Sequence, residues 1–421
     1  MKFAKYVIGL TLAVSTGACA SLEPRNPVPA ALVEEAVVPG FETVRQWGDY
    51  NDPADVRRQM LNRAERLKAR FGPEAETGET PKLTYLALSG GGQYGAFSAG
   101  ALTAWTKTGT RPEFDGVTGI STGSIIAPFA FLGEKYDPVL EEIYTTFSTD
   151  DMLEPQILSG LLGGSSVADT GPLREKIAAY VTREFLEEVA VEHRKGRLLF
   201  VGTTNLDVGR SVIWNMGAIA ASGQPGALEL FRKIILASAA IPIAFPPVFF
   251  DVEAEGGRYE ELHVDGGVTT QVNILSPQIP SYLMDDLVGF HVERELFVLV
   301  NGAVIPLREP VSPRIHKIGG ASINALWYAQ AVGDLYKIHA VAERDNVTAN
   351  YGWIPASFAE VPGEQFDPAF MRKLFDLGGD LLTTGEMWRR VPPNFSTREE
   401  GVALPEEAPD PEKLEELAAA E

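Results

Sequence analysis

Residues 119–123 of the chain read Gly-Ile-Ser-Thr-Gly, and the fold is decided by this stretch. It lies between an apolar approach, residues 114–120, and a run of small and apolar residues, 124–132. A G-x-S-x-G pattern where a strand turns into a helix is typical of a nucleophile elbow, because only glycine fits two residues either side of the exposed serine. Ser121 is therefore the candidate nucleophile. A simple glycine-serine turn would produce the same pattern, so the assignment depends on the rest of the chain.

A second turn lies upstream, where residues 89–95 read Ser-Gly-Gly-Gly-Gln-Tyr-Gly. It follows an apolar run at residues 83–88, which predicts a buried strand, and precedes a predicted helix at about 96–105. A turn of this composition between a strand and a helix allows three interpretations: an anion-binding loop, a dinucleotide site or a bland glycine turn.

The first interpretation makes Gly90, Gly91 and Gly92 an oxyanion loop. Successive glycines let two or more backbone N–H groups converge, and the start of the following helix adds positive potential. An ester carbonyl becomes negatively charged as it turns tetrahedral, and losing one donor typically costs about 2.7–4 kcal/mol of barrier. Gly92 and Ser121 are one strand-loop-helix unit apart, so we expect the two turns side by side at one edge of a sheet.

The same loop satisfies G-x-G-x-x-G through Gly90, Gly92 and Gly95, which is the fingerprint of a dinucleotide site. Such a site needs an acidic residue at the far end of the second strand. Asp115 lies at the start of that strand, and its far end carries the serine turn instead. This placement disfavours a nucleotide as the ligand.

Downstream, residues 261–264 predict a short strand that runs into Asp265-Gly266-Gly267. A carboxylate at a strand end, beside residues that let the backbone come close, is a candidate general base. Asp-Gly is also a common turn, in which the aspartate only caps the backbone. A free aspartate has a pKa of about 3.9, but burial raises the pKa, and direct contact with the serine hydroxyl would let the carboxylate accept its proton.

The composition describes an acidic globular protein. The chain has 421 residues, 45% of them hydrophobic, and a formal net charge of −21. This charge argues against a nucleic-acid partner, which needs clustered Lys and Arg, and against simple electrostatic adsorption to an anionic membrane. Beyond the N-terminus no apolar run of about 20 residues predicts a membrane-spanning helix. One large α/β domain with appendages is expected.

Residues 1–18 are predicted to be an export signal, with Lys2 and Lys5 in a basic head, an apolar middle and a small-residue end. Cys19 is the single cysteine, and it falls where a bacterial lipoprotein signal places its lipid-modified residue. We expect lipidation at Cys19; the alternative is an ordinary signal cleaved nearby. The expected location is the cell envelope, as an outer-membrane lipoprotein or a periplasmic protein, with membrane contact through the N-terminal anchor.

The rest of the chain divides into three parts. Residues 19–81 predict a lipid-anchored, proline-containing tether and an N-terminal helix at 52–71. Residues 82–390 form the predicted catalytic domain, and residues 391–421 an acidic, disordered tail.

Further elements of the predicted catalytic domain follow from periodicity and turn residues. They are helices at 138–147, 172–191, 227–239, 315–344 and 368–377, and strands at 197–205, 210–214 and 294–300. Residues 148–171 are predicted to form a long apolar loop, which either packs over the core or is a mobile cover for an apolar substrate. Residues 241–250 are too rich in proline for regular structure and predict buried packing, with an acyl groove near Phe245 as the lesser alternative.

Taken together, the strand-GGG-helix, the G-x-S-x-G and the D-G-G resemble the patatin-like phospholipase family, in this order and at comparable separations. The resemblance covers about residues 82–270 and continues less sharply to 379. Three further stretches resemble the family: Asp-Thr-Gly-Pro-Leu at 169–173, Thr-Asn-Leu-Asp-Val-Gly-Arg at 204–210 and Ser-Ala-Ala-Ile-Pro at 238–242.

The resemblance implies a three-layer α/β/α sandwich with a mainly parallel central sheet. It also implies hydrolysis of acyl esters of lipids or phospholipids by a Ser-Asp dyad through an acyl-serine intermediate, with no cofactor and no metal. Ser121 would match the nucleophile, Asp265 the base, and residues 90–92 the oxyanion loop. One departure is Tyr94, which stands where the family commonly has a basic residue, and it would weaken the stabilisation of charge in the transition state.

Two other functions remain open at this point. A Ser-Asp-His triad, as in α/β-hydrolases, is available with His291, His316 or His339, although the glycine loop of those enzymes lies further upstream of the elbow. His263 is a separate candidate, two residues from Asp265 on one strand face but about 6–7 Å away along the chain. The non-enzyme alternative is an envelope scaffold that has lost turnover; joint retention of the serine, the glycines and the aspartate argues against it.

Overall fold

The computed structural model of the protein describes residues 25–50, 52–155, 166, 168–274, 277–304, 310–358 and 360–395. The predicted signal, Cys19 and residues 396–421 of the predicted tail lie outside these ranges. Within them, no helix combines the length and the apolar composition needed to cross a membrane.

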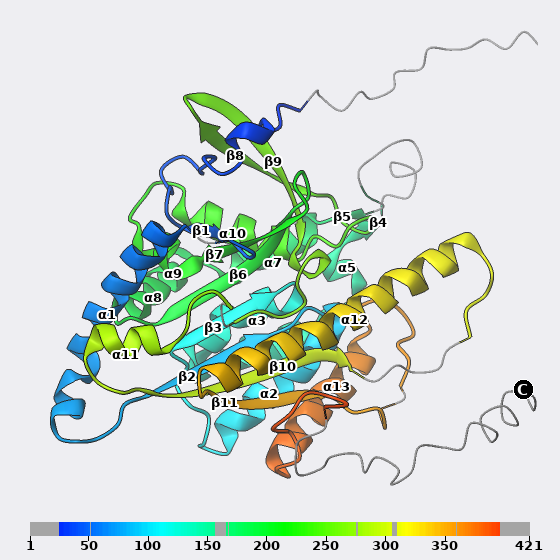
Figure 1. The fold of residues 1–421 in the computed structure, drawn as a ribbon. Coiled ribbons are helices and arrows are strands. Elements are labelled where there is room, and N and C mark those ends of the chain that lie inside the picture. Colours follow the sequence, from blue (N-terminus) through cyan, green and yellow to red (C-terminus); the bar gives the residue numbers. More distant parts are fainter. Residues whose placement is uncertain are drawn as a thin grey trace, which may run out of the picture.

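Five parallel strands form the centre of the sheet (Figure 1). In spatial order they are β6 (Leu198–Asn205), β3 (Gly116–Ile120), β2 (Lys82–Leu88), β10 (Glu293–Ala303) and β11 (Thr348–Ile354). Every residue of β3, and every residue of β2 after Lys82, is buried. Strands covered on both faces read as continuous apolar runs, which is why the sequence predicts β2 so clearly.

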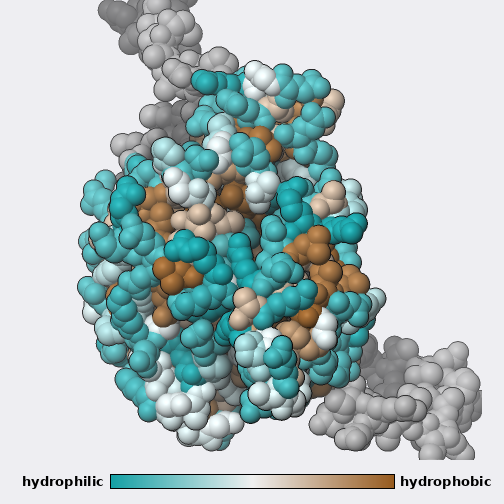
Figure 2. Space-filling view, turned by 90° about the vertical axis from the view of Figure 1, so that its left-hand side faces the viewer, coloured by the Kyte–Doolittle hydropathy of each residue, from teal (hydrophilic) through white to brown (hydrophobic). Residues whose placement is uncertain are grey.

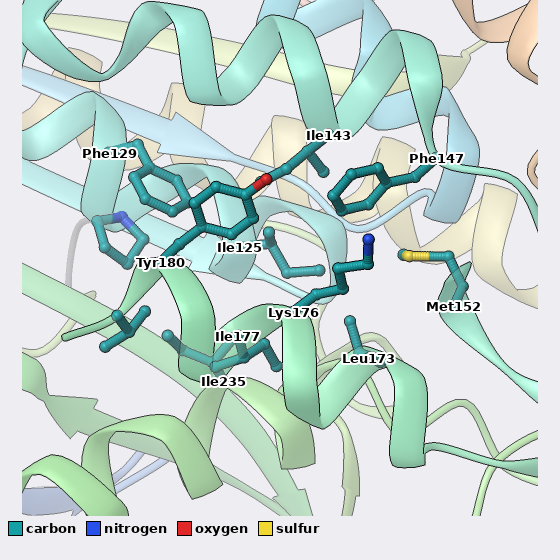
Figure 3. Close-up of a pocket in the computed structure, with 12 residues that line it drawn as sticks. Ile125, Phe129, Ile143, Phe147, Met152, Leu173, Lys176, Ile177, Tyr180 and Ile235 are labelled. Atoms are coloured by element: carbon teal, nitrogen blue, oxygen red, sulfur yellow. The ribbon is translucent and has the colours of Figure 1, made fainter.

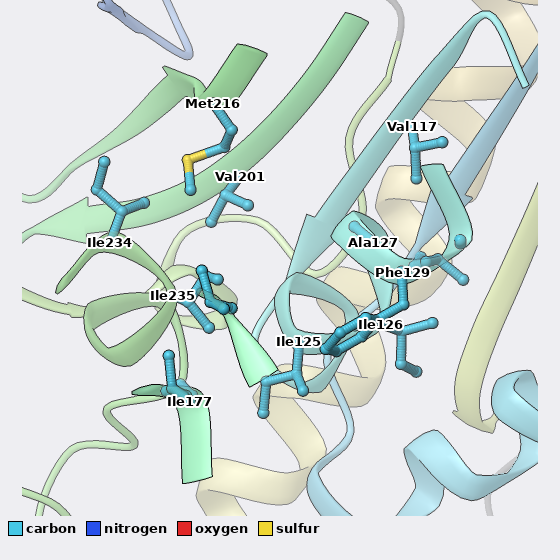
Figure 4. Close-up of a cluster of buried hydrophobic side chains, with 14 of the residues drawn as sticks. Val117, Ile125, Ile126, Ala127, Phe129, Ile177, Val201, Met216, Ile234 and Ile235 are labelled. Atoms are coloured by element: carbon cyan, nitrogen blue, oxygen red, sulfur yellow. The ribbon is translucent and has the colours of Figure 1, made fainter. Parts of the chain in front are cut away.

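Alternate side chains of β2 enter two separate apolar cores, so helices cover both faces of the sheet. Figure 4 shows part of the first core, where α3 meets β3, β6 and α10. The helices over this core include α2 (Gly95–Lys107), α3 (Thr122–Leu132), α4 (Asp137–Thr146), α8 (Arg183–Arg194), α10 (Ala227–Ser238) and α13 (Pro368–Thr383). The second core lies under α1 (Pro53–Glu76), α11 (Tyr282–Val288) and α12 (Ile315–Arg344). The predicted three-layer α/β/α sandwich with a mainly parallel sheet is confirmed.

Antiparallel strands extend the sheet beyond β6. They are β7 (Arg210–Asn215), β1 (Arg45–Trp47), β8 (Val248–Ala254) and β9 (Gly257–Asp265). β6 pairs with β3 up to Gly202, which lies opposite Ile120, and from Thr203 onward it pairs with β9 instead. Since Thr203 lies opposite Asp265, the ends of β3 and β9 meet at consecutive positions of one strand. This junction brings together two segments far apart in the sequence.

The remaining elements are short. They are α5 (Thr149–Met152), β4 (Glu154–Pro155), β5 (Ala168–Asp169), α7 (Gly171–Tyr180), α9 (Met216–Ala221) and the 3-10 turns Ala30–Leu32, Gly92–Tyr94, Glu134–Tyr136 and Gly266–Val268. The stretch predicted as one loop, 148–171, thus contains a helical turn and a two-stranded pair, while residues 156–165 lie outside the described ranges.

Two of the predicted elements differ from the structure, and some of its elements were not predicted. The helix expected at 172–191 is two helices, because Thr182 is extended and its Oγ1 accepts the Phe185 N–H to start α8. The proline-rich stretch expected to be irregular already contains β8 from Val248, directly after its last proline. β11 was not predicted, although it is buried in the sheet.

The body also extends further than predicted at both ends. The segment expected to be a free tether packs on the body from Arg25, whose guanidinium bonds both carboxylate oxygens of Asp207 at 2.8 and 2.7 Å. Phe41 and Val44 of the same segment are buried. At the other end the ring of Phe395, beyond the predicted boundary at residue 390, contacts His339 with 4.7 Å between ring centroids.

The surface agrees with the acidic composition. On the face shown in Figure 2 hydrophilic side chains predominate, and apolar ones form separate patches between them. A net charge of −21 keeps such a surface well hydrated.

Candidate active site

Ser121 lies in the turn between β3 and α3 with φ +53° and ψ −123°. A non-glycine residue rarely adopts positive φ, and such strain costs about 1–3 kcal/mol, so it persists only where the surroundings hold the residue in place. Here the Ser121 N–H donates to Ser238 Oγ at 3.0 Å, and Ser124 Oγ donates to the Ser121 carbonyl at 2.6 Å. Ser238 Oγ in turn donates to the carbonyl of Gly202 in β6 at 2.7 Å. The stretch 238–242 therefore matters because its serine holds the elbow.

Gly119 and Gly123 of the elbow have no room for a side chain. A Cβ on Gly119 would lie 2.1 Å from the carbonyl oxygen of Gly123. A Cβ on Gly123 would lie 2.4 Å from the carbonyl oxygen of Leu88 in β2. The first turn of α3 thus packs directly against the backbone, as the G-x-S-x-G pattern predicts.

Asp265 is in direct contact with Ser121. Ser121 Oγ donates to Asp265 Oδ2 at 2.6 Å, and the Gly267 N–H donates to Asp265 Oδ1 at 2.7 Å. Both side chains are buried, with 6% of Ser121 and 4% of Asp265 exposed. Burial raises the pKa of Asp265 to about 7, against the opposing effect of the two hydrogen bonds. A carboxylate with this pKa is a much stronger base than a free aspartate.

The glycine loop reaches the same place from β2. The Gly90 N–H is already engaged, because it donates to the Gln271 carbonyl at 3.1 Å. In the described part of the chain, the amides of Gly91 and Gly92 have no such acceptor, and these residues have φ +149° and +56°. A Cβ on Gly91 would lie 2.0 Å from the carbonyl oxygen of Asn301. The loop therefore offers two amides for an anion, those of Gly91 and Gly92, and Gly90 serves as an attachment point.

Asn301 at the end of β10 holds the start of this loop. Its Nδ2 donates to the Ser89 carbonyl at 2.9 Å, and its N–H donates to Ser89 Oγ at 2.8 Å. Its Oδ1 accepts from Ser98 Oγ of α2 at 2.6 Å. Sequence reasoning missed Asn301; the signal for it is a polar residue directly after the apolar run of a parallel strand, at the edge where such sheets bind ligands.

Asp334 of α12 links the glycine loop to the turn after Asp265. Its Oδ2 accepts the N–H groups of Gln271 and Val272 at 2.7 and 3.3 Å. Gln271 accepts from Gly90 and also donates through Nε2 to the Gly267 carbonyl at 2.8 Å. Burial raises the pKa of Asp334 to about 6. Neither Gln271 nor Asp334 lies in a recognisable motif, and sequence reasoning missed both.

The pocket beside Ser121 is apolar and encloses about 440 Å³ of empty space, part of it open to solvent. Ile125 and Ile143 line it from α3 and α4, and Met152 of α5 lies over it. Phe245, considered for an acyl groove on sequence grounds, also lines this pocket. Such a wall suits the hydrocarbon part of a lipid.

Tyr94, the departure from the expected basic residue, points into the helical layer. Its ring meets the ring of Phe370 of α13 edge-on, with 5.5 Å between centroids. The contact gives this position a packing role in the present chain.

The histidines considered for a triad are engaged elsewhere. His263 is completely buried between Thr203 Oγ1, at 2.8 Å, and Glu261 Oε2, at 3.1 Å. His291 is exposed and pairs with Asp285 at 3.0 Å, and His339 contacts the Tyr351 hydroxyl at 3.2 Å. The side chain of His316 lies outside the described part of the structure. No described histidine replaces the direct contact between Ser121 and Asp265.

The structure also argues against the dinucleotide alternative, because its candidate acidic residue is engaged away from the glycine loop. Asp115 accepts the Thr84 N–H at 2.8 Å and pairs with Arg70 at 2.5 Å, at the start of β3 and so at the opposite edge of the sheet from the glycine loop. Within the described ranges, no three His, Cys, Asp or Glu side chains gather in a way that could hold a metal ion.

Comparison with known proteins adds a family match. Residues 86–277 match the family described as patatin-like phospholipase. No curated protein sequence matches the chain. Similar solved structures include VipD from Legionella pneumophila, with 12% identity over 73% of this chain and 67% of that one and a TM-score of 0.35. Human GIVD cytosolic phospholipase A2 has 10% identity over 66% of this chain and a TM-score of 0.30, and the match spans 53% of its length.

Proposed function

Since residues 86–277 are a patatin-like phospholipase domain, we propose that the protein hydrolyses acyl ester bonds of lipids with Ser121 as nucleophile and Asp265 as general base. The observation that carries the proposal is the 2.6 Å hydrogen bond from Ser121 Oγ to Asp265 Oδ2 in a buried, apolar site. A serine hydroxyl is a weak nucleophile until an adjacent base removes its proton, and this contact supplies the base without a histidine.

In the first step Ser121 Oγ attacks the ester carbonyl carbon while its proton moves to Asp265 Oδ2. The carbonyl oxygen becomes negative, and the N–H groups of Gly91 and Gly92 hold that charge. The intermediate then collapses, the bond between the carbonyl carbon and the alcohol oxygen breaks, and the alcohol leaves with the proton from Asp265. An acyl group remains on Ser121.

In the second step water attacks the acyl-serine carbonyl while Asp265 accepts its proton. Collapse of the second tetrahedral intermediate breaks the bond between the carbonyl carbon and Ser121 Oγ, and Asp265 returns the proton to that oxygen. The fatty acid is released and the dyad is restored. The backbone strain at Ser121 supports this use, because it keeps Oγ at the tip of the turn through both steps.

Variants at the dyad test the proposal. Ser121→Ala and Asp265→Asn are each expected to lose at least about a thousandfold in kcat/KM, since removal of one member of a nucleophile-base unit disables the whole unit. His291→Ala is the control, with unchanged turnover. Release of fatty acid from phospholipid and from short-chain esters is measured for each. Loss of activity in His291→Ala alone would favour a triad, and no release from any ester by the unaltered protein would favour a scaffold.

A further inference from the structure

Figure 3 shows a second apolar cavity, which shares wall residues with the pocket beside Ser121. It lies between α3, α4, α7 and α10 and has about 420 Å³ of empty space, part of it open to solvent. The two spaces share five wall residues, Ile125, Ile143, Phe147, Met152 and Leu173. They are therefore neighbouring spaces with part of their walls in common.

The second cavity leads away from Ser121 along α3. Ile125 is one turn beyond Ser121 and Phe129 is one turn further, so at 1.5 Å per residue the far wall is about 12 Å from the serine. Ile177 of α7 and Ile235 of α10 close that wall. An apolar chain attached at Ser121 reaches this cavity only if it is long.

The wall carries one charged side chain, Lys176. Its Nζ lies 3.1 Å from Asp151 Oδ1 and 4.1 Å from the centroid of the Phe147 ring, so its charge is compensated at the rim. The rest of the wall is aliphatic or aromatic. Transfer of a hydrocarbon chain from water into a cavity of this kind is favourable, whereas transfer of a polar headgroup is not.

We propose that this second cavity receives the distal part of the fatty acyl chain and sets the chain-length preference of the enzyme. The inference rests on the proposed function, because it places the ester carbonyl at Ser121. A short acyl group ends in the first pocket, whereas a long one passes the shared side chains. Met152 is unbranched and rotates more easily than a β-branched residue, which suits it to that position.

The test fills the cavity and compares two substrates. Ile235→Phe adds volume at the far wall, and Leu230→Phe is the matched control, on the same helix, buried and outside both cavity walls. We expect Ile235→Phe to lower the ratio of kcat/KM for a long-chain over a short-chain p-nitrophenyl ester at least about tenfold, while Leu230→Phe leaves the ratio unchanged. Thermal melting verifies that both variants are folded.

An unchanged ratio in folded Ile235→Phe overturns the proposal. If that variant does not fold, Ile235→Ala enlarges the cavity and must move the preference toward longer chains; no movement overturns it equally. Binding of a fluorescent long-chain fatty acid to Ser121→Ala, with and without Ile235→Phe, separates this inference from the proposed function. If the unaltered protein hydrolyses neither ester but Ile235→Phe abolishes fatty-acid binding to Ser121→Ala, the assignment of the cavity stands and the hydrolase proposal is wrong.

A different observation concerns the N-terminal half of α12. This helix has 30 residues, about 45 Å, whereas its neighbour β11 has 7 residues, about 23 Å. The C-terminal half packs on the sheet through Leu335, Ile338 and Ala342. None of the described side chains at 315–326 is buried, and Figure 1 shows this half extending beyond the sheet.

The projecting half is apolar on one side. Ile315, Ile318 and Leu326 are 88%, 50% and 69% exposed, and their spacing places them along one side of the helix. Between residues 310 and 333 the sequence has no Asp or Glu, in a chain that has 57 of them. The same stretch carries exposed Arg314 and Lys317.

We infer that the projecting half of α12 docks on an anionic lipid bilayer. Exposed aliphatic side chains enter the acyl boundary, the two cations face lipid phosphates, and the absence of carboxylates removes repulsion. α12 connects the parallel strands β10 and β11, so its N-terminus lies at the sheet edge that carries Ser121 after β3. Docking through α12 therefore turns the site toward the membrane.

Vesicle sedimentation tests this inference with the full-length protein carrying Cys19→Ser, so that no lipid at that residue contributes. Phosphatidylcholine vesicles with phosphatidylglycerol are used. Ile318→Asp with Leu326→Asp is expected to weaken binding at least about tenfold, as charges on the apolar face of an interfacial helix do. Val361→Asp, at another exposed apolar residue, is the control, and hydrolysis of a soluble short-chain ester stays unchanged.

Equal vesicle binding by the double variant and the control would overturn the proposal that α12 docks on a bilayer. Sedimentation velocity without vesicles tests the other possible occupant. If the protein is a dimer that dissociates in the double variant, this face binds a second copy of the chain and the bilayer proposal is wrong. Neither measurement requires hydrolysis, so both remain informative if the proposed function fails.

Discussion

At the scale of single residues, Asp265 determines how the proposed reaction responds to pH. It is buried beside Ser121, and burial is the main cause that raises its pKa to about 7. A general base must be ionised, so activity follows the ionised fraction of this carboxylate.

We expect kcat/KM for a soluble ester to rise tenfold per pH unit below about pH 7 and to level above it, because the pKa of Asp265 is about 7. The pH profile of initial rates measures this. A plateau that extends down to pH 5 would contradict it, since Asp265 would then ionise like a free aspartate or would not be the base.

The same raised pKa predicts that ionisation of Asp265, which activity requires, lowers the free energy of unfolding. Between about pH 4 and 7 folded Asp265 keeps a proton that the unfolded chain has released, because the unfolded pKa is about 3.9. Stability therefore falls as pH rises through this window, and the full cost, up to about 4 kcal/mol, is present above pH 7. Asp265→Asn removes the ionisation. Its melting temperature should exceed that of the unaltered protein at pH 8, and the difference should shrink toward pH 4; a lower value at pH 8 would contradict this.

Gly91 and Gly92 form a matched pair in the glycine loop. A Cβ on Gly91 would meet the Asn301 carbonyl at 2.0 Å, whereas a Cβ on Gly92 meets nothing within 4 Å. Gly91→Ala must displace the loop and its amides, so we expect kcat to fall by about 10²–10³. Gly92→Ala carries only the strain of positive φ, about 1–2 kcal/mol, and should lose less. Steady-state kinetics compare them, and equal losses would show that Gly91 has no special position.

At the scale of elements, the site depends on how β6 changes partners. Its Gly202 pairs with Ile120 and its Thr203 with Asp265, so two strands that end at the same height deliver the serine and the carboxylate to one point. α12 contributes from the other face of the sheet through Asp334, which holds the segment between the glycine loop and the Asp265 turn.

Asp334 is therefore expected to be a positioning residue. Asp334→Ala leaves the Gln271 and Val272 N–H groups without their acceptor, which should cost about 1–3 kcal/mol in unfolding free energy. It should also lower kcat more than it raises KM, because the glycine loop shifts while the apolar pocket stays. Asp334→Asn keeps an acceptor oxygen and should restore most of kcat. Chemical unfolding and kinetics measure both, and a normal kcat in Asp334→Ala would contradict the positioning role.

At the scale of the whole molecule, the chain is a strongly acidic body for which we propose a lipid substrate. With a net charge of −21, attraction to an anionic membrane has to come from local features. Lipidation at Cys19 and location in the cell envelope, as an outer-membrane lipoprotein or in the periplasm, remain predictions from the sequence.

Cys19→Ser tests the anchor. We expect the substitution to abolish incorporation of labelled fatty acid in cells, because Cys19 is the only thiol in the chain. Hydrolysis of a soluble ester should be unchanged, since Cys19 has no part in the proposed chemistry of Ser121 and Asp265. Labelling that persists in Cys19→Ser would rule out this residue as the attachment site.

The sequence by itself determined the local parts of the protein. The G-x-S-x-G and Gly-Gly-Gly turns are readable because a tight turn restricts residue type over a few positions, whatever lies elsewhere in the chain. The buried strand β2 and the long helix α12 are readable because periodicity is local. With the resemblance to the family, now matched over residues 86–277, these turns also predicted the layered fold.

Only the tertiary structure decided which of these parts meet. The contact of Ser121 with Asp265 spans 144 residues, and that of Asn301 with Ser89 spans 212. Such contacts follow from the order and register of strands in the sheet, which no local pattern encodes. For the same reason only the structure assigned the Gly90 amide to Gln271 and enclosed a second cavity between four helices.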